Sequence, residues 1–189
     1  MNEATGAGVV AGRGAASPAL AQAGPNAVPP DQGRTLVLGL GNPILRDDGV
    51  GLAVAQVLRE RLAGAAGVEV DVESRGGLRV VERMTGYERV VLIDALCSGR
   101  VPGAVLRLTL RAIPTQHNAS GHDVNLATAL ALARASGLDV PRAEDVHIVA
   151  IEVEQVDTFG TTLTRRVSRA VGRAARLVER ILTEQGVVA

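Results

Sequence analysis

From Thr35 onward, short apolar segments alternate with segments of helical periodicity, and few folds accommodate such an alternation. Five apolar segments are expected strands, at 35–40, 68–72, 89–96, 104–110 and 146–153. The segments between and after them have apolar residues at helical spacing, so we expect helices near 50–62, 78–86, 124–135 and from 162 onward. Strands that alternate with helices are typical of an α/β fold, an open sheet with helices on both faces.

The connection before the fourth strand indicates how that strand runs. About ten residues separate Asp94, near the end of the third strand, from the apolar segment AVLRLTL at 104–110. A parallel crossover needs about a dozen residues or more, so we expect the fourth strand to run antiparallel to the third. The expected sheet is therefore about five-stranded and mostly parallel, with one antiparallel strand.

The charged residues and the single cysteine exclude several classes of protein. The chain has 20 basic and 20 acidic residues, and every basic residue is an arginine. A balanced charge gives no indication of nucleic acid or of a basic membrane patch, and a chain without lysine cannot use Schiff-base or P-loop chemistry. No apolar stretch reaches the roughly 20 residues of a membrane span. We expect a cytoplasmic protein with no nucleic-acid or membrane partner.

Residues 1–33 differ in composition from the rest of the chain. They are rich in alanine, glycine and proline and show no sustained apolar period. Such a segment buries little apolar surface, so we expect a disordered N-terminal extension followed by one domain over residues 34–185.

Acidic and imidazole side chains follow the expected strands at one edge of the sheet. Asp47 and Asp48 come after the first strand, Asp94 ends the third, and His117 and His122 precede the helix at 124–135. The carboxyl ends of parallel strands share one edge, where ligands bind in open α/β sheets. Oxygen and nitrogen donors from separate loops suit a divalent metal with open coordination positions.

Simpler interpretations exist for each of these residues. Asp47 or Asp48 can be the N-cap of the helix that begins near residue 50, which is a common position for aspartate. Loop histidines are often surface residues. Cys97 is a small packed residue in one interpretation, and a nucleophile with a loop histidine as its base in another.

Three blocks of the sequence stand out together: VLGLGNPILRDDGVG at 37–51, VVLIDAL at 90–96 and SGHDVNLATALALA at 120–133. In order and spacing they resemble the hydrogenase maturation proteases, and the resemblance extends over roughly residues 35–183. It implies a three-layer α/β/α sandwich. It also implies an endopeptidase, aspartic-type or metal-assisted, whose partner is the precursor of the [NiFe] hydrogenase large subunit. The enzyme would remove the C-terminal extension of that precursor after nickel insertion.

The resemblance also implies site residues. The catalytic and metal-binding positions of the family fall on Asp48, Asp94 and His122, and His117 is the rival for the histidine position. Nickel would be carried by the substrate, and another divalent metal could occupy the site in its absence. The segment ESRGG at 73–77 departs from the family pattern, so the particular hydrogenase is not specified.

The loop after the first strand is expected to shape this site. Asn42 can hold the loop by side-chain hydrogen bonds, and Asp47 would cap or hydrogen-bond next to the ligand Asp48. Tight turns and close backbone approach are expected at four glycines: Gly39, Gly41, Gly49 and Gly51. A non-catalytic metal-binding or metallochaperone module with the same ligands is the alternative function, and a cysteine hydrolase that uses Cys97 is a third.

Overall fold

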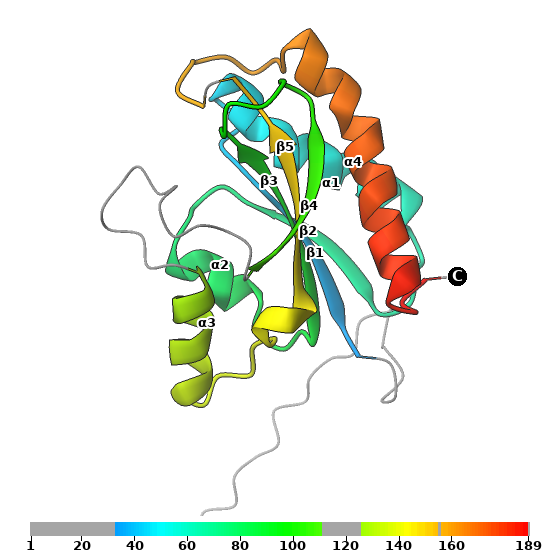
Figure 1. Ribbon diagram of the computed structural model, residues 1–189. Helices are drawn as coiled ribbons and strands as arrows, with labels where there is room; N and C mark the ends of the chain where they lie inside the picture. Colours follow the sequence, from blue (N-terminus) through cyan, green and yellow to red (C-terminus); the bar gives the residue numbers. More distant parts are fainter. Residues whose placement is uncertain (1–32, 111–125, 155, 189) are drawn as a thin grey trace, which may run out of the picture.

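The computed structural model describes residues 33–110, 126–154 and 156–188, which form a five-stranded sheet between two layers of helices (Figure 1). The sheet order is β2-β1-β3-β5-β4. Four strands are parallel, and β4 pairs antiparallel with β5. The strands are β1 Thr35–Leu40, β2 Val68–Glu73, β3 Arg89–Leu96, β4 Val105–Thr109 and β5 Val146–Glu152.

Two helices cover each face of the sheet. The helices α1 (Val50–Arg61) and α4 (Arg165–Glu184) pack on one face, and α2 (Leu78–Arg83) and α3 (Leu126–Ala135) pack on the other. Two short 3₁₀ helices, η1 (Arg46–Gly49) and η3 (Ala143–Asp145), precede α1 and β5. The predicted α/β/α sandwich, with a mostly parallel sheet and one antiparallel strand, is confirmed.

The central strands are buried on both faces because helices cover both. In β1, Leu36 and Leu38 lie in the core beneath α2 and α3, while Val37 lies in the core beneath α1 and α4. These side chains are at most 1% exposed. The unbroken apolar segments that predicted strands therefore reflect burial on alternating faces of a parallel sheet.

The fourth strand runs in the predicted direction, but β5 lies between it and β3. The N–H of Gly103 donates to the carbonyl of Glu152 at 2.7 Å, and the N–H of Glu152 donates to Ala104 at 2.8 Å. The short connection after β3 thus passes the end of β5 before β4 begins. The length of this connection predicts the direction of β4 but does not predict which strand β4 pairs with.

The last helix begins at Arg165, three residues later than the periodicity predicts, because Thr164 has extended backbone angles and is its N-cap. The predicted inward residues all lie in the core beneath α1 and α4, namely Val167, Val171, Ala174, Leu177, Val178 and Ile181. In the described residues, no helix is both long and apolar enough to cross a bilayer. The predicted N-terminal extension and both candidate site histidines, His117 and His122, lie outside the described residues, apart from Gly33.

Candidate functional site

The loop after β1 holds its own aspartate in place. The Oδ1 of Asn42 accepts a hydrogen bond from the N–H of Ile44 at 3.1 Å, which closes the predicted side-chain turn. The N–H of Asn42 donates to Oδ2 of Asp48 at 2.6 Å. One oxygen of the Asp48 carboxylate is therefore fixed by the backbone at the start of its own loop.

Three of the four glycines around this loop are required by close backbone approach. A Cβ on Gly51 would lie 2.2 Å from the carbonyl oxygen of Leu40 and 2.4 Å from that of Ile93. A Cβ on Gly39 would lie 2.4 Å from the carbonyl oxygen of Gly51. Helix α1 thus starts almost in contact with the ends of β1 and β3, which brings the loops after both strands together.

The remaining two glycines differ from each other. Gly41 has a φ of +136°, and a Cβ there would lie 2.0 Å from the carbonyl oxygen of Asp48. At Gly49 the nearest atom to such a Cβ is 3.5 Å away and the φ is −70°, so the predicted need for glycine at that position is wrong. The tight turn after β1 depends on Gly41.

Asp47 is buried and binds the start of α4. Its Oδ1 accepts the N–H of Thr164 at 2.6 Å, and its Oδ2 accepts the hydroxyl of Thr164 at 2.8 Å. The N-cap of α1 is Gly49, and no side chain caps that helix, so the interpretation of either aspartate as the N-cap of α1 is wrong. Asp47 instead ties the loop that carries Asp48 to the last helix.

Asp94 lies on β3 at the carboxyl edge, close to Asp48. Burial raises the pKa of Asp94 to about 7, against the hydrogen bond from the N–H of Ala95, and the charge of Asp48 raises it further. The structure therefore brings these two predicted site residues together, as their positions after parallel strands suggested. Two neighbouring carboxylates repel when both are ionised, and a cation between them would remove this repulsion.

The donor set of this pair suits a hard divalent cation. Carboxylate oxygens are ligands for such ions, but two carboxylates are an incomplete set. Within the described residues no group of three or more histidine, cysteine, aspartate or glutamate side chains is placed to hold a metal. A third ligand would have to come from elsewhere, and the predicted ligand His122 lies outside the described residues.

Glu152, at the end of β5, is a buried carboxylate that was not among the predicted site residues. It is 0% exposed and accepts hydrogen bonds from the N–H of Ser98 at 2.7 Å, the hydroxyl of Ser98 at 2.8 Å and the N–H of Arg100 at 2.9 Å. Burial alone would raise its pKa, but the bonds from Ser98 and the Arg100 loop outweigh burial and lower it. Glu152 thus fixes the loop that follows Asp94.

The signal for Glu152 was present in the sequence. It is an acid near the end of an apolar strand, VHIVAIEV, in the same relation to its strand as Asp94. Its partners Ser98 and Arg100 lie 54 and 52 positions away, so no local pattern could identify them.

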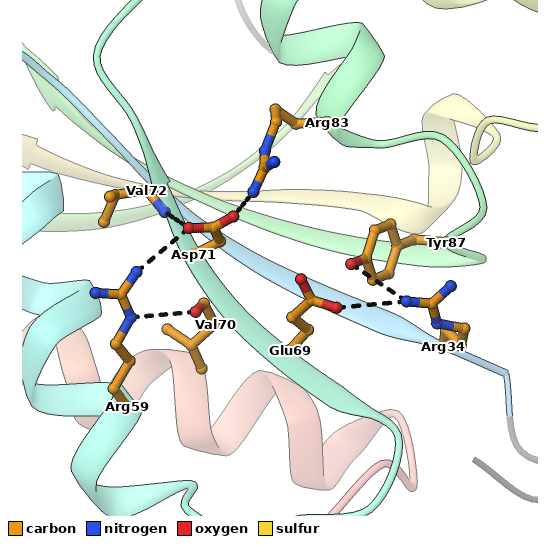
Figure 2. Close-up of polar contacts among 8 residues, drawn as sticks. All are labelled: Arg34, Arg59, Glu69, Val70, Asp71, Val72, Arg83 and Tyr87. Carbon is orange, nitrogen blue, oxygen red and sulfur yellow. Dashed lines mark hydrogen bonds and ion pairs between the residues drawn. The ribbon is translucent and has the colours of Figure 1, made fainter. Parts of the chain in front are cut away.

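A shallow hollow of about 460 Å³ lies beside the loop after β1. It includes part of the segment 73–77 that departs from the family pattern, and it is lined by Pro43, Leu52, Asp71, Val72, Glu73, Ser74, Arg75 and Arg83. Figure 2 shows Asp71 between Arg59 and Arg83, with which it forms ion pairs. Because Arg75 also pairs with Glu73, the charges of this hollow are largely matched within the chain.

Cys97 is exposed, and its thiol donates to the carbonyl of Glu154 at 3.3 Å. The one histidine among the described residues, His147, is near the start of β5, opposite Val91 of β3. Cys97 follows the far end of β3. The described part of the chain therefore contains no cysteine–histidine pair that would support the hydrolase interpretation of Cys97.

Comparisons with known proteins agree with this fold. A family model described as hydrogenase maturation protease matches residues 54–181. The hydrogenase expression/formation protein HoxM of Azotobacter vinelandii is 29% identical over 157 residues, which cover 82% of this chain and 74% of that protein. The hydrogenase 2 maturation protease of Escherichia coli (strain K12) is 27% identical over 159 residues, 82% of this chain and 94% of that protein.

Two solved structures are similar in fold. The hydrogenase maturating endopeptidase HybD from Escherichia coli has a TM-score of 0.64 at 23% identity, covering 81% of this chain and 94% of its own. The [NiFe] hydrogenase maturation protease HybD from Thermococcus kodakarensis has a TM-score of 0.55 at 26% identity, covering 78% of this chain and 98% of its own.

Proposed function

Because the chain belongs to the hydrogenase maturation protease family, we propose that it removes the C-terminal extension of the [NiFe] hydrogenase large-subunit precursor after nickel insertion. The observation that carries this proposal is the proximity of Asp48 and Asp94 at the carboxyl edge of the sheet. Residues 34–185 would be the protease domain, and the reaction would take place in the cytoplasm.

In this proposal nickel belongs to the substrate. Asp48, Asp94 and His122 supply oxygen and nitrogen donors without a thiolate, and such a set does not hold nickel strongly against competing metals. Nickel already bound in the precursor would instead be contacted by these side chains. Its presence would mark the precursor that is ready for cleavage.

The role of the described residues is to aim the acid pair at the precursor. The N–H of Asn42 orients Asp48, and Glu152 holds the loop that follows Asp94. Peptide hydrolysis needs a base for the attacking water, and carboxylates are among the groups that serve as that base. Aspartic-type and metal-assisted cleavage would both use this pair.

The test is cleavage of nickel-loaded precursor by the purified protein, followed by intact mass. Asp48→Asn and Asp94→Asn keep the side-chain shape and remove the charge that attracts a cation, so each should abolish processing. Asp139→Asn, at an exposed position, is the matched control and should process normally. Full processing by either site variant would contradict the assignment, and binding of the precursor without cleavage by the unmodified protein would favour the metallochaperone alternative.

The histidine position is tested in the same assay. His122→Ala should abolish processing and His117→Ala should have a mild effect. The opposite ranking would assign the role to His117.

Nickel as the recognition mark needs a separate experiment. Nickel-free precursor is mixed with enzyme that has been incubated with excess nickel, in a chelator that binds free ion but does not strip the loaded precursor. We expect no cleavage. Equal rates for empty and loaded precursor would show that the ion is not the mark.

A further inference from the structure

Six exposed arginines lie along the outer face of α4 and are called here the arginine stripe. At about 100° per residue they fall within an arc of about 100°, on the side opposite the buried residues of the helix. The stripe consists of Arg165, Arg166, Arg169, Arg173, Arg176 and Arg180. It extends over about 22 Å at about 1.5 Å per residue. The whole chain has balanced charge, but positive charge is therefore concentrated on one helix.

The stripe is not neutralised within the described residues. The two acids of the helix are engaged elsewhere, since Glu179 pairs with Arg61 and Glu184 pairs with Arg107. Arg173 donates to the carbonyl of Gly103, and no arginine of the stripe forms an ion pair with a described carboxylate.

The placement of these arginines does not help the helix to fold. Like charges three or four residues apart destabilise a helix. Arg165 and Arg166 also stand in the first turn, where the helix dipole disfavours positive charge and where the helix has no acid of its own; Asp47 binds the preceding residue, Thr164. An anionic partner would remove both costs.

The stripe begins at the candidate site. Thr164, the residue before Arg165, is bound by Asp47 in the loop that carries Asp48. Figure 1 shows α4 running from this end of the sheet along the outside of the molecule. A precursor whose cleavage site is bound at Asp48 and Asp94 would therefore also lie next to the arginine stripe.

On this basis, and resting on the proposed function, we infer that the arginine stripe is a docking surface for an acidic patch on the precursor large subunit. Carboxylates match the guanidinium fork in geometry and charge. Single-stranded nucleic acid fits less well, because α4 carries no aromatic side chain on which bases could stack. A membrane surface fits less well because the apolar face of α4 is buried against the sheet rather than exposed.

The test compares two variants with the same change in net charge. Arg169→Glu/Arg176→Glu reverses the middle of the stripe, and Arg79→Glu/Arg142→Glu reverses two exposed arginines on α2 and before β5. The stripe variant should raise KM for nickel-loaded precursor at least about tenfold at low salt, because like charges would face each other, and leave kcat nearly unchanged. The control variant should behave as the unmodified protein.

Direct binding of the precursor, measured without cleavage, separates the docking surface from the proposed function. Failure of the unmodified protein to cleave would contradict the function, whereas equal precursor affinity of the two double variants would overturn the docking surface. If the charge-reversed stripe variant does not fold, Arg169→Gln/Arg176→Gln replaces it in the same measurement. A smaller loss of affinity is then expected. Loss of binding to a short DNA duplex or to anionic lipid vesicles, with precursor affinity unchanged, would likewise overturn the proposal.

Discussion

Asp94 lies close to the carboxylate of Asp48, and burial together with that neighbouring charge raises the pKa of Asp94 to about 7. A raised pKa in the folded state means that this group contributes stability below its ordinary value of 3.8 and loses that contribution as the pH rises through about 7. In the metal-free protein, ionised Asp94 therefore opposes folding.

Asp94→Asn should accordingly stabilise the metal-free protein at pH 8 while it abolishes processing. We expect a gain of at least about 1 kcal/mol, since one pKa unit corresponds to about 1.4 kcal/mol, and this gain should shrink toward pH 4. Urea unfolding in the presence of a chelator measures the free energy at both values. A gain that is the same at pH 4 and pH 8 would show that charge is not its cause, and Asp139→Asn provides the control.

Glu152→Gln should lower the free energy of unfolding, which is the opposite of the effect expected for Asp94→Asn. The pKa of Glu152 is lowered, so this carboxylate contributes stability above its ordinary 4.5 and loses it as the pH falls through the lower folded value. An amide cannot accept every bond from Ser98 and Arg100, and we expect a loss of about 2–3 kcal/mol at pH 7. Unfolding of Glu152→Gln beside the exposed control Glu60→Gln checks this, and a loss as large at pH 3 would contradict it.

The Asp47–Thr164 contact should couple the first loop to the last helix. In a double-mutant cycle with Asp47→Ala and Thr164→Val, we expect a coupling of about 1–2 kcal/mol, because a buried carboxylate loses a hydroxyl donor. Thr164→Ser keeps the hydroxyl and should retain most of the stability. Strictly additive effects in the cycle would mean that the hydroxyl bond does not stabilise the fold.

Cys97→Ser should leave processing nearly unchanged. The thiol is exposed, and no described histidine lies near enough to serve as its base. Single-turnover cleavage of the precursor measures the rate, with Asp94→Asn as the inactive reference. A rate reduced to that of Asp94→Asn would revive the cysteine hydrolase interpretation.

Deletion of residues 2–33 should change the melting temperature by less than about 2 °C. A segment without periodic apolar residues buries little surface, and a loss of about 1 kcal/mol would already shift the midpoint by several degrees. Thermal unfolding of the two proteins at equal concentration gives the comparison. A midpoint several degrees lower would indicate that the segment packs on the domain.

Local signals were sufficient for the elements of the fold. The strands were predicted to within about two residues because glycines or charged residues bound the apolar runs. Arg89, for example, is the first residue of β3. The strand that pairs with β4 could not be predicted, because the length of a connection indicates the direction of the next strand but not its position in the sheet. The last helix began later than predicted because Thr164 is held in an extended conformation by Asp47, a contact across 117 positions.

The candidate site was predictable only in part. Asp48 and Asp94 could be expected to meet because parallel strands end at one edge of a sheet. Glu152 stands near the end of an apolar strand, as Asp94 does, but its role depends on a loop 52–54 positions away that no local pattern connects to it. The roles of Asp48, Asp94, His117 and His122 stay predictions.

The contact between Asp47 and Thr164 also determines when, during synthesis, the loop that carries Asp48 can be anchored to the last helix. A ribosome completes Asp47 long before Thr164, which follows it by 117 positions. At about 5–20 residues per second, this interval is about 6–23 s. During that time the loop that carries Asp48 has no anchor on the last helix. A nascent chain would therefore carry the Asp48 loop without this contact until translation has passed residue 164.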